Sequence, residues 1–452
     1  MIVAKFGGTS VESAEAMTRV ADIVCTLAPR RPLVVLSACS GITNTLLSLA
    51  RSAREGRVAD VDETILRVRE RHLAIARELI HGPAYDAFAR PLEMSFQSLR
   101  TFLQAVTVMQ DLTARAQDYI TSFGEQWSTA IFSAALRERD LPVALVDARD
   151  ILVTDGKFTA AIPQFEPSRS RLHAKILPLI AERRIVVTQG FVGATGEGVT
   201  TTIGRGGSDY SAAIFSALLE AEELQIWTDV DGVLTADPSV VPGAMNIPEM
   251  TFNEAAELAY FGARVLHPSS ILPAVDMDIP VRVLNSRKPD HPGTVIRRQI
   301  TGPRTHRVQS IAYKEGVSLL TIRSNRTMIA PAFISHVFSV FGAHHKVIDT
   351  IVTSETGVSL TLRDRDHMEE ILAALDRVGT VTWQPGRAVV TVVGEGLRQS
   401  VSARSQVFAT LADTGVHVDL ISLGGSDISI TFVIQETDIA TTVRALHTRF
   451  FE

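Results

Sequence analysis

A lysine, two glycines and two hydroxyl residues stand together near the start of the chain, in Lys5-Phe-Gly-Gly-Thr-Ser10. Glycines let backbone N–H groups approach a phosphate closely, and the N-terminus of a following helix adds a favourable dipole. The ammonium group of Lys5 can neutralise charge on a phosphoryl group during transfer. The motif therefore predicts a phosphate-binding turn. A plain tight turn with a surface lysine is the alternative, because short glycine motifs are common.

The densest group of chemically useful residues is Thr-Thr-Thr-Ile-Gly-Arg-Gly-Gly-Ser-Asp at 200–209, just before a predicted helix. Arg205 can form a bidentate pair with a substrate carboxylate. Asp209 can hold an ammonium group or organise metal-bound phosphates. A purely structural loop seldom combines hydroxyls, glycines, a cation and an acid at this density. We therefore predict a substrate-binding loop.

Three further segments have one functional and one structural interpretation each. Thr228 and Asp229 follow a predicted strand and can bind a ribose or the waters of Mg²⁺, or simply stabilise a turn. Glu125 follows Gly124, which we interpret as a break before a helix, so this acid serves either the site or the helix N-terminus. The segment 189–193 either brings backbone to the same site or is an ordinary turn.

The elements that must position these residues alternate between strand and helix, as in a parallel sheet with both faces covered. Each predicted strand is a near-continuous apolar run, and small-residue turns follow several of them; residues 51–120 read as long amphipathic helices. The predicted strands are 2–6, 33–36, 143–146, 185–187, 224–227 and 281–284. Ligands of such sheets lie beyond the carboxyl ends of the strands, where the candidate residues fall.

The last third of the chain follows a different pattern and contains an internal repeat. The alternation breaks around 289–293, where we place a domain boundary. Beyond it, matching residues recur with a constant offset of 70: Val337-Phe338 as Val407-Phe408, Asp349 as Asp419, and Ser359 and Thr361 as Ser429 and Thr431. Each copy reads strand, helix, strand, strand, helix. This predicts two copies of one α/β unit with helices on one face of a sheet.

Composition excludes several classes of protein. The 452 residues are 46% hydrophobic, which suits about three folded domains, and the formal net charge of -6 gives no reason to expect nucleic acid or an anionic membrane as partner. No signal peptide and no run of ~18 apolar residues is apparent, so we expect a cytoplasmic protein whose Cys25 and Cys39 are reduced. P-loop, protein-kinase and G-x-G-x-x-G motifs are absent, and we predict no metal-ligating residues.

Four motifs together resemble the aspartokinase family, most closely its monofunctional, lysine-sensitive type. They are Lys5-Phe-Gly-Gly-Thr-Ser-Val11, Gly204-Arg-Gly-Gly-Ser-Asp209, Trp227-Thr-Asp229 and Phe261-Gly-Ala-Arg-Val-Leu-His-Pro268. The resemblance spans essentially the whole chain, and the repeat is similar to the tandem ACT domains of that family. It implies an amino-acid-kinase α/β/α sandwich with a mainly parallel sheet over 1–298. Two ferredoxin-like α+β ACT domains are then implied over 308–380 and 381–452.

The resemblance implies a reaction that suits the residues found. ATP and Mg²⁺ would phosphorylate the side-chain carboxylate of L-aspartate to 4-phospho-L-aspartate, the first step toward lysine, threonine and methionine. An aspartate side chain has a pKa near ~3.9, so this nucleophile is already ionised at pH 7. Such a site needs positioning and charge neutralisation rather than a Ser-His or Cys-His pair, and no such pair is recognised in the chain.

The resemblance also implies roles for individual residues. Lys5 and Asp209 are the implied catalytic pair. The implied aspartate contacts are Thr43, Glu125, Arg205 and Ser208. The implied nucleotide contacts are Gly7, Gly8, Thr9, Ser37, Thr228, Asp229, Leu234, Ser239 and Arg264. The implied effector contacts are Phe333, Ile334, Val347, Ile348, Asp349 and Ser354.

Several residues depart from the family pattern. Leu234 stands where a tyrosine is usual, Ser239 where an arginine is usual, and Arg264 replaces a lysine that approaches ATP phosphate in the family. An arginine keeps the charge but is not equivalent to an ammonium, so we predict altered nucleotide binding rather than lost activity. Thr327 and Ala332 replace a methionine and a glycine of the effector site, which leaves lysine, threonine or another effector open.

Two questions of assembly and activity stay open at this point. ACT units normally pair edge to edge, so a homodimer or a larger assembly is expected, and Asp349 is alternatively a strand-edge acid in that interface. The rival functions are a kinase of the same fold acting on glutamate, N-acetylglutamate or uridylate, and an effector-binding regulatory protein with a weakened kinase domain. The intact Lys5, Arg205 and Asp209 favour an active enzyme.

Overall fold

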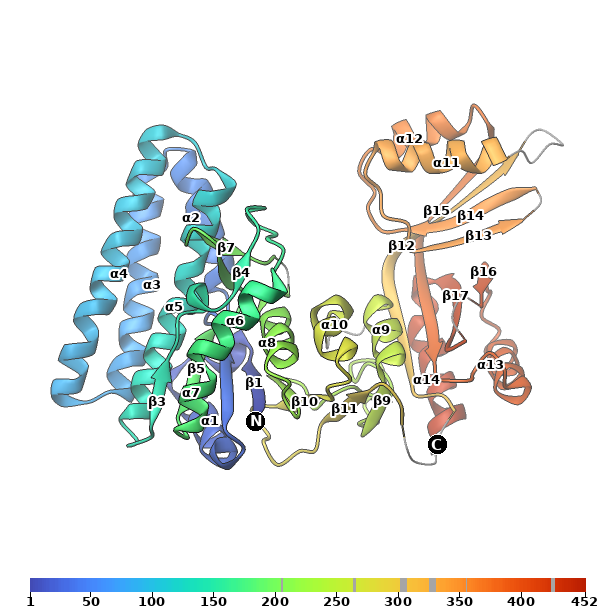
Figure 1. Ribbon diagram of the computed structural model, residues 1–452. Coiled ribbons are helices and arrows are strands. Elements are labelled where there is room, and N and C mark those ends of the chain that lie inside the picture. Colours follow the sequence, from blue (N-terminus) through green and yellow to red (C-terminus); the bar gives the residue numbers. More distant parts are fainter. Residues whose placement is uncertain (205, 263–265, 301–306, 325–330, 355, 424–426) are drawn as a thin grey trace. The chain divides into compact units, whose positions relative to one another are not determined.

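The computed structural model of the chain describes residues 1–204, 206–262, 266–300, 307–324, 331–354, 356–423 and 427–452 (Figure 1). The chain divides into two compact units. Unit 1 contains 1–233, 248–252 and 267–300, and unit 2 contains 234–247, 253–266 and 301–452. Arg205, Arg264, Thr327 and the side chain of Ala332 lie outside the described part of the chain.

Unit 1 is built on an eight-stranded sheet in the order β3-β5-β2-β1-β8-β10-β11-β9. All its neighbouring strands are parallel except β10 and β11. The strands are β1 (Ile2–Phe6), β2 (Pro32–Leu36), β3 (Val143–Leu145), β5 (Ile185–Gln189), β8 (Leu224–Thr228), β9 (Glu249–Thr251), β10 (Val281–Asn285) and β11 (Thr294–Arg297). The predicted apolar strands are therefore confirmed, and β9 and β11 extend the sheet beyond them.

Register brings the carboxyl ends of the central strands to one edge of this sheet. Phe6 of β1 pairs with Leu36 of β2 on one side and with Trp227 of β8 on the other. Leu36 in turn pairs with Gln189 of β5. Because parallel strands run in one direction, the residues that follow them, including the glycine turn after β1, begin at this edge.

Helices cover the sheet in two groups, which gives the predicted α/β/α sandwich (Figure 1). Ile2, Ala4 and Phe6 of β1 face the first group, whereas Lys5 points to α8 in the second. The first group is α1 (Ala14–Leu27), α2 (Ile42–Arg54), α3 (Val58–Leu79), α4 (Gly82–Met109) and α5 (Ala114–Arg137). The second is α6 (Phe165–Lys175), α7 (Leu177–Ala181), α8 (Gly207–Leu218) and α10 (Pro268–Asp276).

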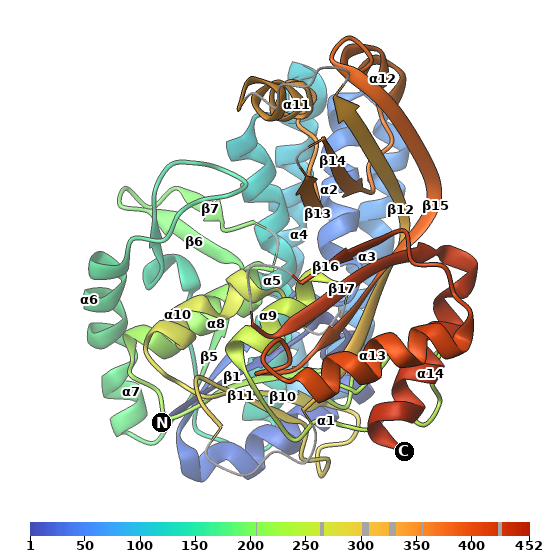
Figure 2. The ribbon, with the colours of Figure 1, turned by 90° about the vertical axis from the view of Figure 1, so that its right-hand side faces the viewer.

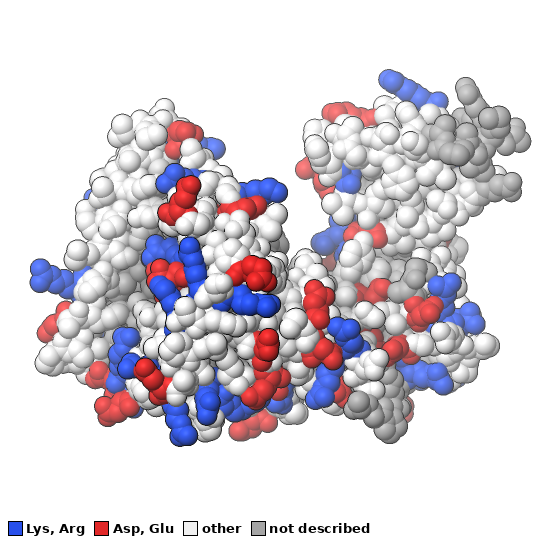
Figure 3. Space-filling view, viewed as in Figure 1, with Lys and Arg blue, Asp and Glu red and all other residues white. Residues whose placement is uncertain are grey.

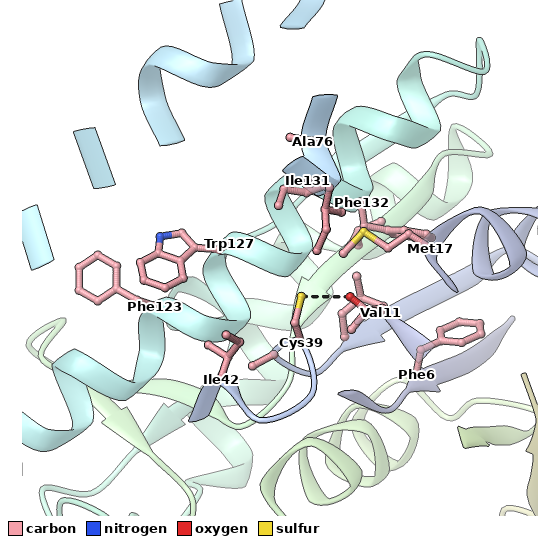
Figure 4. Packing of buried hydrophobic residues seen from close by; sticks show 14 of the residues in the cluster. Phe6, Val11, Met17, Cys39, Ile42, Ala76, Phe123, Trp127, Ile131 and Phe132 are labelled. Atoms are coloured by element: carbon pink, nitrogen blue, oxygen red, sulfur yellow. Dashed lines mark hydrogen bonds between the residues drawn. The ribbon is translucent and has the colours of Figure 1, made fainter. Parts of the chain in front are cut away.

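The core beneath the first group of helices is apolar and aromatic (Figure 4). Trp127 stacks on Phe96 with ring centroids 4.0 Å apart and meets the edge of His72 at 5.1 Å. Burial lowers the pKa of His72 to about 4, so this imidazole is neutral at pH 7. Burial raises the pKa of the Cys39 thiol to about 12, and both Cys39 and Cys25 are free cysteines.

A small three-stranded sheet, which the sequence analysis did not predict, lies beside the main one. It consists of β4 (Val153–Thr154), β6 (Val192–Thr195) and β7 (Thr200–Thr202) in the order β4-β6-β7. Thr200–Thr202 is the threonine run of the predicted substrate-binding loop, so these hydroxyl residues form a strand. The loop itself begins only after Thr202.

Unit 2 carries a six-stranded antiparallel sheet in the order β13-β14-β12-β15-β17-β16. Its strands are β12 (Ser310–Ser324), β13 (Thr350–Ser354), β14 (Gly357–Leu362), β15 (Gly379–Val393), β16 (Leu420–Ser422) and β17 (Ser429–Gln435). Its helices are α9 (Phe252–Tyr260), α11 (Pro331–Ala343), α12 (Met368–Leu375), α13 (Val401–Thr414) and α14 (Ile439–Phe451). Both repeat copies therefore have the predicted order of strand, helix, strand, strand, helix.

The two repeat copies share long strands instead of forming separate sheets. β12 and β15 run side by side along the unit 2 sheet (Figure 2), and each contributes to two apolar clusters. The predicted boundary between 380 and 381 falls inside β15. The first residues of β12, 310–314, pair with the end of β15 beside the second copy. The segments 234–247 and 253–266, which the sequence analysis placed in the kinase domain, group with unit 2.

Surface charge on unit 1 is mixed. On the face seen in Figure 3, acidic and basic side chains are interspersed over this unit, in keeping with the balanced composition. Within the described residues, no helix combines the length and the apolar character that a membrane span needs.

Candidate active site

The structure brings Lys5 and Asp209 together at the carboxyl edge of the main sheet. The Nζ atom of Lys5, in β1, lies 2.6 Å from the Oδ1 atom of Asp209, in the first turn of α8, and both side chains are largely buried. A lysine in the middle of a buried strand requires such a partner, because an unpaired ammonium in this position would be strongly destabilising. Two of the predicted site residues, far apart in sequence, are thus in direct contact.

The glycine turn after β1 is fixed by its neighbours at the same edge. The N–H group of Gly7 donates to the carbonyl oxygen of Trp227 at 3.0 Å, and the N–H group of Ser40 donates to that of Gly8 at 3.1 Å. A Cβ atom on Gly8 would lie only 2.9 Å from the carbonyl oxygen of Ala38. This position therefore requires glycine, because a side chain would push the turn away from the end of β2.

The first turn of α8 packs closely against the turn that follows β5. A Cβ atom on Gly190 would lie 2.7 Å from the Cα atom of Ser208, so the predicted segment 189–193 does reach the candidate loop. Gly206 precedes α8 with a φ of 73°, in the left-handed region that favours glycine. The N-terminus of α8 thus points its partial positive charge to the edge that carries Lys5, which favours an anion there.

Glu125 is placed differently from the sequence interpretation. It lies within α5, not before a helix, because Gly124 serves close packing instead of breaking the chain: a Cβ atom there would meet that of Ala38 at 2.8 Å. Burial raises the pKa of Glu125 to about 8, although a hydrogen bond from the backbone of Ala38 favours its ionised form. Its Oε2 atom has no hydrogen-bond partner among the described residues. An amino group of a ligand would satisfy it.

Asp118 is a buried acid on the same helix as Glu125 that the sequence did not single out. Its fully buried carboxylate accepts hydrogen bonds from the N–H groups of Thr159 and Thr202, each at 2.9 Å, and from the Thr202 hydroxyl at 2.6 Å. Burial raises its pKa, while these hydrogen bonds favour the ionised form. One signal was available: Asp118 precedes Glu125 by seven residues, which places both acids on the same face of α5.

Thr228 and Asp229 follow β8 at the edge, next to the end of β10. The N–H group of Ser286 donates to the carbonyl oxygen of Thr228 at 2.8 Å, and the Ser286 hydroxyl lies 2.8 Å from that of Ser10 in the turn after β1. The Thr228 hydroxyl donates to the exposed carboxylate of Asp229 at 3.2 Å. These contacts place the two predicted nucleotide residues beside the predicted phosphate-binding turn.

A second cluster at the ends of β8 and β10 also escaped the sequence analysis. Lys288 and Asn285 donate hydrogen bonds to the carboxylate of Asp231 at 2.7 and 2.6 Å. The hydrogen bond from Lys288 is the main reason that the pKa of Asp231 lies below its usual value. No short motif marks such a cluster, because its members come from separate strands.

Six other predicted substrate or nucleotide contacts divide into three groups. Thr43, in α2, and Ser208, in α8, are half-buried on elements that reach the edge of the sheet. Leu234 and Ser239 lie in unit 2. The Ser310 hydroxyl donates to the carbonyl oxygen of Leu234 at 2.8 Å, and the Ser239 hydroxyl donates to the carboxylate of Asp237 at 2.6 Å. Arg205 and Arg264 are outside the described residues, so their roles stay predictions.

The predicted effector residues lie in the first repeat copy of unit 2. Asp349 forms an ion pair with Lys314 at 2.7 Å, and the Tyr260 hydroxyl donates to the carbonyl oxygen of Asp349, also at 2.7 Å. Phe333, Ile334 and Ile348 pack into or against the apolar cluster of this copy. Val347 is 73% exposed, and the Ser354 hydroxyl donates to the carbonyl oxygen of Gly357. The role of these six residues as effector contacts stays a prediction.

Asp349 and Tyr260 also line a large cavity within unit 2. Its volume is about 920 Å³, and its wall includes the acidic residues Glu257, Asp349, Glu395 and Asp427. Acidic walls favour a cationic group over an anion. The cavity is large enough for an amino acid, although it is wider than one such ligand requires.

Comparisons with known proteins agree with this architecture. Residues 1–285 match the amino acid kinase family, and residues 390–450 match the ACT domain. The chain is 36% identical over 467 residues to aspartokinase 2, chloroplastic, of Arabidopsis thaliana, covering 100% of this chain and 84% of that protein. It is also 36% identical over 465 residues to lysine-sensitive aspartokinase 3 of Escherichia coli (strain K12), covering 100% and 99%.

Two solved structures of E. coli aspartokinase III are similar over their full length. The complex with aspartate and ADP, in the R-state, has a TM-score of 0.82, and the complex with lysine and aspartate, in the T-state, has a TM-score of 0.85. Each is 35% identical to this chain, and both chains are covered completely.

Proposed function

The chain belongs to the amino acid kinase family and, within it, to the aspartokinases, and from this membership we propose that it transfers the terminal phosphoryl group of ATP to the side-chain carboxylate of L-aspartate. The observation that carries the proposal is the contact between Lys5 and Asp209, 2.6 Å apart, beside the glycine turn after β1. A cation, an acid and a phosphate-binding turn at one edge of the sheet are what this reaction requires.

The reaction needs little covalent chemistry from the protein. A carboxylate oxygen of aspartate forms a bond to the γ-phosphorus, and the bond between that phosphorus and the bridging oxygen of ADP breaks, so no proton has to be removed. In our proposal, Lys5 neutralises the charge that spreads over the transferred group, and the turn at Gly7 and Gly8 positions the phosphates. The N-terminus of α8 adds its dipole. Catalysis then rests on positioning and on charge neutralisation.

Recognition of aspartate is assigned to residues around the buried acid of α5. The unpaired oxygen of Glu125 receives the substrate ammonium, which makes the ionised carboxylate favourable in a site where burial otherwise raises its pKa. Arg205 binds the α-carboxylate by its bidentate geometry, and Thr43 and Ser208 add hydroxyl contacts. A glutamate substrate is one methylene longer and would misplace its carboxylate relative to the γ-phosphate.

Magnesium fits the residues present. Mg²⁺ in phosphoryl-transfer sites is bound by one or two carboxylates together with substrate phosphates, and Asp209 offers such a carboxylate at the edge of the sheet, where one oxygen contacts Lys5. We assign Asp209 this role, with Asp229 close to the nucleotide. The ion would offset the negative charge of the ATP phosphates.

Regulation is assigned to unit 2. We propose that the two repeat copies are ACT domains that sense an amino acid, lysine or threonine, with Asp349 as the carboxylate for its ammonium. β13 is an edge strand of the sheet and is half-exposed to exposed, so it can pair with a second chain to form a homodimer. We expect the enzyme to work in the cytoplasm, at the start of lysine, threonine and methionine synthesis.

A coupled assay of ADP release tests the activity. Purified chain with ATP and Mg²⁺ should release ADP with aspartate and not with glutamate, N-acetylglutamate or UMP. The product should react with hydroxylamine, as an acyl phosphate does. ADP release with another acceptor would favour a different kinase of this fold. If none of these acceptors led to ADP release but unit 2 still bound an amino acid, the regulatory alternative would be favoured.

A further inference from the structure

Two histidines and a glutamate converge on the helical side of the first repeat copy. His344 directly follows α11, His367 precedes α12, and Glu370 lies in the first turn of α12. One potential ligand atom from each of the three lies within 4.8 Å of the other two. The Nδ1 atom of His367 is 3.3 Å from one carboxylate oxygen of Glu370, and the Nδ1 atom of His344 is 3.9 Å from the other.

This donor set suits a borderline-soft divalent metal. Zinc binds imidazole nitrogen and carboxylate oxygen at about 2.0–2.2 Å in tetrahedral geometry, which sets neighbouring ligand atoms roughly 3.3 Å apart. His367 and Glu370 already have this spacing, and no two ligand atoms of the group are more than 4.8 Å apart, so the ligands need to approach one another by about 1.5 Å or less. The side chains of His367 and Glu370 are exposed, so rotamer changes can close the remaining gap. Calcium and magnesium prefer sets made only of oxygen.

We propose that His344, His367 and Glu370 bind one divalent transition-metal ion of the zinc class, with water completing the coordination. The charged residues close in sequence include Lys346 and Asp364, which pair with each other. Lys346 would repel a cation, but its ammonium is paired with Asp364 at 2.7 Å. Asp364 interacts electrostatically with His367, so a carboxylate also lies near the proposed site. These charges leave the surroundings compatible with a bound cation.

The ion would join two helices that carry different parts of the copy. His344 follows α11, which holds Phe333, and precedes Val347 by three residues. An ion that fixes the end of α11 to the start of α12 would restrict the motion of Phe333 and Val347, two of the predicted effector residues. By thermodynamic linkage, metal and effector would then change each other's affinity by the same factor. This consequence rests on the proposed function, whereas metal binding itself does not.

The test uses the full chain without an affinity tag, in metal-free buffer and without substrates. Zn²⁺ is titrated in competition with a chromophoric chelator, and Co²⁺ is followed by its visible absorption, which is intense for four-coordinate sites. We expect one equivalent of metal per chain. His344→Ala, His367→Ala and Glu370→Gln should each weaken binding by about 10-fold or more, because each removes one of three ligands.

Matched controls lie on the same helices. His336→Ala removes an exposed histidine of α11, and Glu369→Gln removes the neighbouring acid of α12; both should bind metal as the unchanged chain does. Circular dichroism and thermal unfolding without metal verify that the variants are folded. Equal zinc affinity of the unchanged chain and the His344→Ala/His367→Ala double variant would overturn the site. A failure to phosphorylate aspartate would not contradict the metal site, since the titration contains no substrate.

Discussion

The carboxylate of Asp118 accepts a hydrogen bond from the hydroxyl of Thr202 at 2.6 Å, and this contact ties α5 to the strand β7. The same helix carries Glu125, two turns further on. β7 precedes α8, whose first turn holds Asp209. We therefore infer that Asp118 helps to position the segment after β7 relative to Glu125, the predicted ammonium-binding acid.

Replacing Asp118 with asparagine should test this positioning role. One of the three donors, from Thr159 or Thr202, would then face an amide NH₂ group in place of an oxygen. We expect the free energy of unfolding to fall by about 2–3 kcal/mol, as for a buried donor that loses its acceptor. The KM for aspartate should rise while the KM for ATP changes little.

Asp62→Asn, at an exposed ion pair with Arg100, is the control, and it should change the free energy of unfolding by less than about 0.5 kcal/mol. Equal effects of the two variants would argue against the role.

The pair of Lys5 and Asp209 should control kcat. Lys5→Met removes the cation that we assign to the transferred phosphoryl group, and a loss of about 10²–10³ in kcat is expected for such an electrostatic contact. Asp209→Asn should cause a loss of similar size. The double variant should lose much less than the product of the two, because the residues act as a unit.

A surface lysine supplies the control for this pair. Lys175→Met breaks an exposed ion pair with Asp150 and should leave kcat unchanged. The decisive measurement is kcat at saturating ATP and aspartate for folded variants. If Lys5→Met retained more than about a tenth of the activity, the assignment of Lys5 to the reacting phosphate would be wrong.

The raised pKa of Glu125 predicts a specific pH dependence of stability. Between its unfolded value near 4.5 and its folded value of about 8, the folded chain keeps a proton that the unfolded chain has released. The free energy of unfolding should therefore fall as pH rises through this range, by up to about 1.4 kcal/mol per pH unit from this group. Glu125→Gln should remove that fall.

Urea unfolding between pH 6.5 and 8 is the clearest window for this measurement. His72 has a pKa lowered to about 4 by burial, so it destabilises the folded chain only as pH falls below the usual histidine value of about 6.5. Above pH 6.5 its contribution is nearly constant. Identical slopes for the unchanged chain and Glu125→Gln would show that Glu125 is ionised in the folded chain. Saturating aspartate should flatten the slope by favouring the ionised form.

The sequence predicted the buried parallel strands β1, β2, β3, β5, β8 and β10 of unit 1, because a strand buried on both faces is a continuous apolar run; it did not predict β4, β6, β7, β9 and β11. It also singled out Lys5 and Asp209, which stand in dense local motifs and which the structure brings into contact. It misplaced Glu125, because Gly124 was interpreted as a break, whereas close packing against Ala38 selects glycine inside the helix. Helix-breaking propensity was outweighed there by a tertiary contact.

Contacts between distant segments explain most of what the sequence did not reveal. Asp118 acquires its hydrogen-bond donors only when β7 lies against α5, and neither segment contains a motif for the other. The cluster of Asp231, Asn285 and Lys288 likewise depends on the pairing of β8 with β10. The repeat of unit 2 was recognised from its offset, but the sharing of β12 and β15 by both copies has no periodic signature.

Nucleotide binding can also be tested at Arg264, whose predicted role rests on the sequence alone. Arg264→Lys restores the lysine that the family usually has at this position. The change replaces a planar guanidinium with a compact ammonium group. We expect the KM for ATP to change while kcat for aspartate is retained. A KM for ATP that is the same within error in both proteins would remove this residue from the nucleotide site. Arg298→Lys, at an exposed ion pair with Asp278, is the control.

The internal repeat provides a matched pair of acids for testing effector recognition. Asp349 is paired with Lys314 and its counterpart Asp419 with Arg387, both at 2.7 Å, and both carboxylates are about equally buried. We expect Asp349→Asn to raise the concentration of lysine or threonine needed for half-inhibition by at least about tenfold, since a charge-assisted hydrogen bond contributes about 1.5–3 kcal/mol.

Asp419→Asn removes an equivalent ion pair outside the predicted effector site, so it separates recognition from stability. It should lower the free energy of unfolding about as much as Asp349→Asn does, yet leave the half-inhibitory concentration unchanged. Each variant is compared with its own rate in the absence of effector. If both variants kept normal inhibition but Asp349→Asn dissociated the oligomer in analytical ultracentrifugation, Asp349 would be an interface acid at the sheet edge, because a lost edge contact weakens assembly without touching the effector.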